Sequence, residues 1–119
     1  MDTRLAELRD TLLALYECAR ALDAHEIAYH ALAGALHAAE QLHDEATLEV
    51  IESHARQHVS LMDASHRLSA QSAAERGHHS IFEELALLAG AARLRLKGER
   101  QIQQKGRPQA PSSEQRLTG

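Results

Sequence analysis

The sequence predicts an all-α protein, an antiparallel bundle of about four helices, on two observations. Both prolines lie near the C-terminus, at Pro108 and Pro111, so the long stretch before them contains no proline to break a helix. Apolar residues recur there at three- and four-residue steps, the period of a helix with one buried face. The expected helices span residues 3–22, 24–42, 45–75 and 81–97.

Length and composition add two constraints on this bundle. A chain of 119 residues is expected to form one domain with a modest core. Aromatic residues make up only 3% of the chain, so alanine and leucine must supply the buried volume and the helices must approach closely. We expect the helical domain to cover residues 1–97 and a disordered basic tail to cover residues 98–119.

The first helix, 3–22, carries a heptad pattern typical of a packing helix. Its apolar positions are Leu5, Leu8, Leu12, Leu15, Ala19 and Leu22. Cys18 lies at the margin of this face and is the only cysteine of the chain. We expect it to be a small buried apolar residue without a disulfide partner, which favours a reducing compartment.

The second helix, 24–42, is expected to begin after a break at Asp23. Asp23 followed by Glu26 has the spacing of a capping box, in which the aspartate accepts a backbone N–H and the glutamate reaches back to the cap. The alternative is one helix over residues 3–42, because neither glycine nor proline separates the two. An alanine-rich face with Gly34 beside it predicts close helix contact. That face holds Ala24, Ile27, Ala28, Ala31, Ala35, Ala38, Ala39 and Leu42.

The third helix, 45–75, follows a turn so short that it predicts an antiparallel neighbour, with Asp44 as the N-cap. Its apolar arc holds Val50, Ile51, Ala55, Val59, Leu61, Met62 and Leu68. The centre of that arc is polar: it carries His54, His58, Ser65, Ser69 and Ser72. A helix of this length would extend beyond a compact bundle. We therefore expect a second subunit to cover its last turns.

The fourth helix, 81–97, is expected to start at a capping box of Ser80 and Glu83, after a stop at Gly77. Its inward face holds Ile81, Phe82, Leu85, Leu88, Ala89, Ala92 and Leu96. Leu87 and Leu94 lie on a second side and suggest a contact with another subunit. The predicted interface residues are Leu61, Met62, Leu87 and Leu94.

Charge is divided unevenly along the chain. Residues 1–92 contain 6 Lys and Arg against 15 Asp and Glu, whereas residues 93–119 contain 7 against 2. An acidic body argues against binding a nucleic acid across the main surface. The basic end is expected to complement the acidic body and the C-terminal dipole of the fourth helix, and a weak nucleic-acid or anionic-surface contact through it is the alternative.

Nine histidines suggest a possible metal site. His54 and His58 are four residues apart, so their imidazoles lie on one helix face, a spacing that allows both to bind one zinc or iron ion. Further ligands could come from His25, His78, His79 or Glu83, or from the same pair in a second subunit. The other two interpretations are a neutral, hydrogen-bonded pair at a helix or subunit contact, and a pH-responsive interface.

The functional hypothesis from the sequence is a non-enzymatic adaptor: a homodimeric α-helical module that binds another protein and needs no cofactor. No nucleophile and base stand in a catalytic arrangement, and there is no glycine-rich phosphate loop. Without a signal peptide or an apolar run of about 18 residues, no membrane span is expected, and the expected location is the cytoplasm, in a bacterium. The alternatives are a histidine-ligated metal-binding bundle and the weak anionic-surface binder described above.

Overall fold

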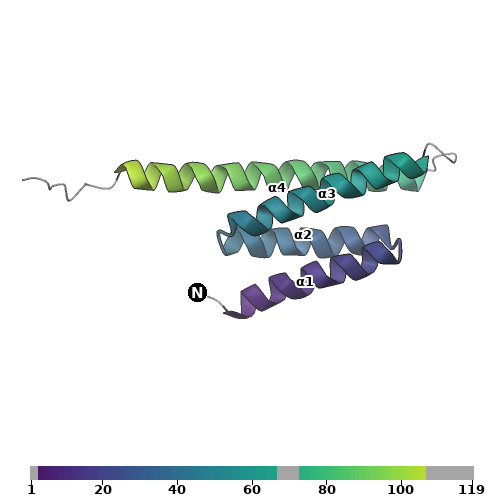
Figure 1. Cartoon of the computed structure of the whole chain (residues 1–119), viewed down its shortest axis with the longest axis horizontal. Helices are drawn as coiled ribbons and strands as arrows, with labels where there is room; N and C mark the ends of the chain where they lie inside the picture. Colours follow the sequence, from purple (N-terminus) through teal and green to yellow (C-terminus); the bar gives the residue numbers. More distant parts are fainter. Residues whose placement is uncertain (1–2, 67–72, 107–119) are drawn as a thin grey trace, which may run out of the picture.

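The structure is a computed structural model that describes residues 3–66 and 73–106, and it confirms the all-α prediction (Figure 1). Four helices follow one another: α1 (Thr3–Ala21), α2 (His25–Gln41), α3 (Glu45–His66) and α4 (Ala73–Gly106). They form two antiparallel hairpins, α1 with α2 and α3 with α4, and α2 lies between α1 and the second hairpin. The chain is therefore built in layers, with α1 and α4 outermost.

The second hairpin differs from the prediction in where its helices end. α3 ends at His66, so it is not the overhanging helix expected to reach residue 75. α4 has 34 residues, which is about 51 Å at 1.5 Å per residue. It passes through Gly77 and Ser80 without interruption, so the predicted stop and capping box are wrong. A glycine and a serine inside a helix cost at most about 1 kcal/mol each, which the packing of a long apolar face outweighs.

Two further expectations concern residues near the C-terminus and residues that follow α3 in the sequence. Residues 98–106, expected to be disordered, continue α4 as helix. Residues 107–119 of the predicted tail lie outside the described residues, as do Leu68, Ser69 and Ser72 of the predicted third helix.

The break between α1 and α2 is confirmed at Asp23, but capping of α2 by its side chain is not the cause. Asp23 has a positive φ of 56°, and the residue that caps α2, Ala24, makes no side-chain cap hydrogen bond. Instead, the backbone N–H of Ala24 donates to the carbonyl of Ala19, and that of Asp23 donates to the carbonyl of Arg20. This pair of bonds is a Schellman motif, which ends α1 in the left-handed conformation.

The same motif ends α2. His43 has a φ of 53°, the N–H of Asp44 donates to the carbonyl of Ala39, and that of His43 donates to the carbonyl of Glu40. Both turns thus place a non-glycine residue where glycine is usually found, which is why the chain offered no glycine signal for either break.

The apolar faces predicted for the four helices are buried in large part. The core holds Tyr16, Leu32, Leu36, Leu48, Ile51, Ala55, Phe82, Leu85, Ala89, Ala92 and Leu96, with the alanines of α2. The predicted close approach at Gly34 is confirmed, because a Cβ there would lie 3.2 Å from Leu12 Cδ1 on α1. A Cβ at Gly34 would therefore require the Leu12 side chain to shift by a few tenths of an ångström.

Several residues differ from the prediction in whether their side chains are buried or exposed. Met62 is only 4% exposed and packs in the core, so it adds no surface to an interface between chains. Cys18 is exposed rather than buried. The other exceptions are apolar residues that were assigned to inward faces but are exposed: Leu8, Leu15, Leu22, Ile27, Val50, Leu61 and Leu88.

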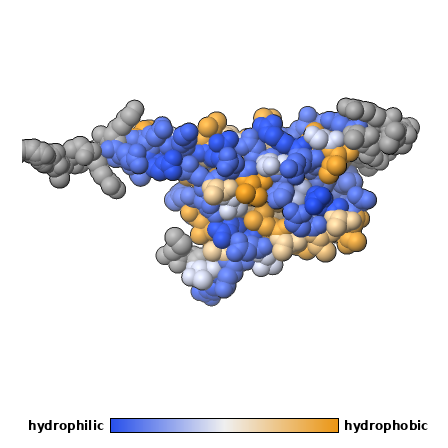
Figure 2. Space-filling view, viewed as in Figure 1, coloured by the Kyte–Doolittle hydropathy of each residue, from blue (hydrophilic) through white to orange (hydrophobic). Residues whose placement is uncertain are grey.

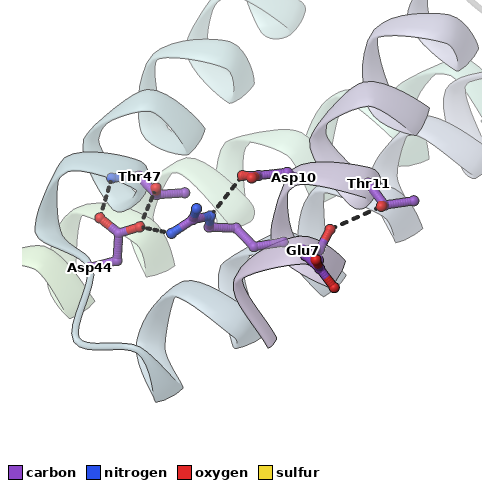
Figure 3. A network of polar contacts seen from close by, with 6 residues as sticks. Glu7, Asp10, Thr11, Asp44 and Thr47 are labelled. Carbon is purple, nitrogen blue, oxygen red and sulfur yellow. Dashed lines mark hydrogen bonds and ion pairs between the residues drawn. The ribbon is translucent and has the colours of Figure 1, made fainter. Parts of the chain in front are cut away.

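Asp44 is confirmed as the N-cap of α3 and also ties the two hairpins together (Figure 3). Its Oδ1 accepts the backbone N–H of Thr47 at 3.1 Å, and its Oδ2 accepts Nη1 of Arg9 from α1 at 2.7 Å. Partial burial opposes ionisation of this carboxyl, but the bonds from Thr47 and Arg9 outweigh it and lower the pKa of Asp44. The start of α3 is thereby fixed against α1.

The basic end of α4 meets the acidic body, as the charge distribution predicted. Arg93 pairs with Glu52 at 2.9 Å, Arg100 with Glu45 at 3.0 Å, and Arg95 with Glu40 at 3.1 Å. These three pairs fix α4 along α3 and α2. In the part of the chain that the structure describes, no helix has an apolar stretch long enough to cross a membrane.

Replacing His43 by glycine is expected to stabilise the protein. A left-handed non-glycine residue costs about 1–2 kcal/mol, and glycine loses about 0.5–1 kcal/mol through the entropy of the unfolded chain, so the net gain is about 0.5–1 kcal/mol. Thermal and urea unfolding of His43→Gly and of the control His43→Ala measure it. If the glycine variant were less stable than the alanine variant, the left-handed turn would not be as described.

Candidate functional site

The chemically distinctive site of the molecule is a buried cluster around His58, in which all four helices take part. His58 on α3 is 2% exposed and is the buried polar residue of the described core. Its Nδ1 lies 3.2 Å from the hydroxyl of Tyr16 on α1, and its Nε2 lies 2.9 Å from Nδ1 of His25 on α2. Its ring stacks on Phe82 of α4, with centroids 3.8 Å apart and planes 7° apart. One side chain therefore contacts the other three helices.

The hydrogen bonds of this cluster fit a neutral His58 in two ways. A neutral imidazole has one donor and one acceptor nitrogen. In one arrangement Tyr16 donates to Nδ1 and Nε2–H donates to His25. In the other, Tyr16 donates to the carbonyl of His54, 3.4 Å away, and accepts from Nδ1–H of His58, whose Nε2 then accepts from His25. Either arrangement satisfies both nitrogens of a ring that water does not reach.

Burial also sets the charge of this ring. It lowers the pKa of His58 from 6.5 to about 4, because the charged form would lose its hydration. The neighbouring His25, Arg20 and His78 lower the pKa further, and Asp23 opposes them. Burial likewise raises the pKa of Tyr16 to about 12. At neutral pH the His58 imidazole and the Tyr16 phenol are therefore uncharged.

The predicted pair His54 and His58 does share one helix face, but Tyr16 lies against both rings. The Tyr16 ring is 5.2 Å from that of His54 and 6.1 Å from that of His58. His54 turns toward the rim, where its Nε2 lies 3.5 Å from a carboxylate oxygen of Glu17. The two imidazoles thus lie in different surroundings: His54 is about 25% exposed beside a carboxylate, and His58 is buried in the core.

The other proposed ligands fall into two groups. His25 and His78 lie beside His58, and the ring centroids of His25 and His78 are 5.6 Å apart. The buried Nδ1 of His78 has no hydrogen-bond partner. His79 instead bridges Asp63 at 2.8 Å and Glu83 at 3.3 Å. Across residues 3–66 and 73–106, no three His, Cys, Asp or Glu side chains converge in a metal-binding arrangement. A zinc or iron centre stays a prediction.

Two members of the cluster were not expected from the sequence. Tyr16 belongs to a helix to which only a packing role was assigned, and Phe82 was assigned only to the core. A signal for Tyr16 was present, because it is four residues after Leu12 and three before Ala19, on the buried face of α1. A phenol on that face needs a hydrogen-bond partner, and the polar centre of α3 offers one.

No protein-family model matches the chain, and neither a curated protein nor a solved structure matches it. The functional argument therefore rests on the residues and their geometry.

The depressed pKa of His58 predicts an acid-sensitive fold. Between pH 6.5 and 4 the unfolded chain binds a proton at this residue that the folded chain does not, so stability is full above pH 6.5 and falls as the pH decreases. The loss from this group is about 3 kcal/mol over that range. Urea unfolding at several pH values measures it. We expect the free energy of unfolding to change less between pH 6.5 and 4 in His58→Leu than in the wild type. His30→Gln, which replaces an exposed histidine, should keep the wild-type pH dependence. An unchanged slope in His58→Leu would show that another group causes the acid sensitivity.

Proposed function

We propose that the protein is a non-enzymatic interaction module whose α3–α4 face binds an apolar helix of another protein. The observation that carries this proposal is a groove across that face with exposed leucines beside it. Leu61 of α3 is 57% exposed and Leu87 of α4 is 68% exposed, although both are large apolar side chains. Large exposed apolar side chains at the edge of a groove favour a site of protein contact.

The groove consists of two adjoining hollows that share Arg56 and Ser60. The larger has a volume of about 620 Å³ and includes Leu61. The smaller has a volume of about 390 Å³ and includes Leu87. The remaining lining residues are Glu49, Glu52, Ser53, Gln57, Val59, Glu83, Ala86 and Arg93. A hollow bordered by leucines at both ends suits the helix-in-groove mode, in which apolar residues one and two turns apart enter one cleft.

A charged network holds the wall of the larger hollow in place. Glu52 accepts hydrogen bonds from Arg56 at 2.9 Å and from Arg93 at 2.9 Å. Bonds from Arg56 and Arg93 lower the pKa of Glu52 despite its partial burial, so it remains ionised at neutral pH. Gly90 makes room for this network, since a Cβ there would lie 3.0 Å from the Glu52 carboxylate. A pre-formed groove loses less entropy on binding than a flexible one.

The polar groups of the groove support binding rather than catalysis. Ser53 and Ser60 lie in the interior of α3, and a serine needs an adjacent base to act as a nucleophile. The buried cluster around His58 lies in the core, where the ring has no access for a substrate. We therefore assign that cluster to the stability of the module and the groove to its function.

Leu61→Lys with Leu87→Lys is expected to weaken partner binding without unfolding the protein, because both side chains are exposed and line the groove. The wild-type chain is used to capture a partner by cross-linking, and the partner is then purified and titrated by calorimetry. We expect the double variant to bind at least tenfold more weakly, consistent with the loss of two anchoring side chains. Leu88→Lys, an exposed leucine next to Leu87 on another side of α4, is the control. Equal affinity in the double variant, or weaker binding in the control alone, would contradict the proposed face.

A further inference from the structure

We draw no further inference here: the strongest candidate, the exposed face of α4 that carries Leu87, Leu94 and Ile102 and shows apolar patches on a mainly hydrophilic surface (Figure 2), has nothing in the structure that shows what covers it.

Discussion

The structure depends on the contact that His58 makes at the centre of the bundle. Within each hairpin the two helices pack along their lengths, and the hairpins meet through the buried alanines and leucines of α2. α1 reaches α3 and its N-cap through side chains, at Arg9 with Asp44 and at Tyr16 with His58. The first of these is a partly exposed ion pair at the start of α3. The second is buried and closes a chain of hydrogen bonds across three helices, so it fixes how the hairpins lie on each other.

A polar residue in this position has a consequence for the rest of the molecule. Because alanine buries little area, the core has less apolar stabilisation than one built of large side chains, so protonation of His58 in acid would remove a large share of the total stability. The outer helices are in the opposite situation. α1 and α4 bury apolar residues against the middle of the bundle and also expose leucines. We therefore place the main source of stability in the middle layer and the proposed partner site at the α3–α4 groove.

The sequence predicted the helical class, the break at Asp23, the N-cap at Asp44 and the exposure of Leu87 and Leu94 because each depends on local chemistry. It could not predict features that depend on what packs opposite. Ser80 and Glu83 have the spacing of a capping box, yet α4 continues through them. The heptad pattern of α1 gave no sign that only half of it is covered within the chain. For the site, His25 beside His58 was among the predicted neighbours, while Tyr16 was missed because its partner lies 42 residues away in the sequence.

The most direct test of the central contact is a double-mutant cycle between Tyr16→Phe and His58→Leu, measured as free energies of unfolding at pH 7. Tyr16→Phe alone leaves a buried imidazole nitrogen without its partner and is expected to cost about 1–3 kcal/mol. In the His58→Leu background the same change should cost much less, giving a coupling energy of about 1 kcal/mol or more. Additive costs for the two changes would mean that the hydroxyl and the imidazole do not hold the hairpins together, and would contradict the account.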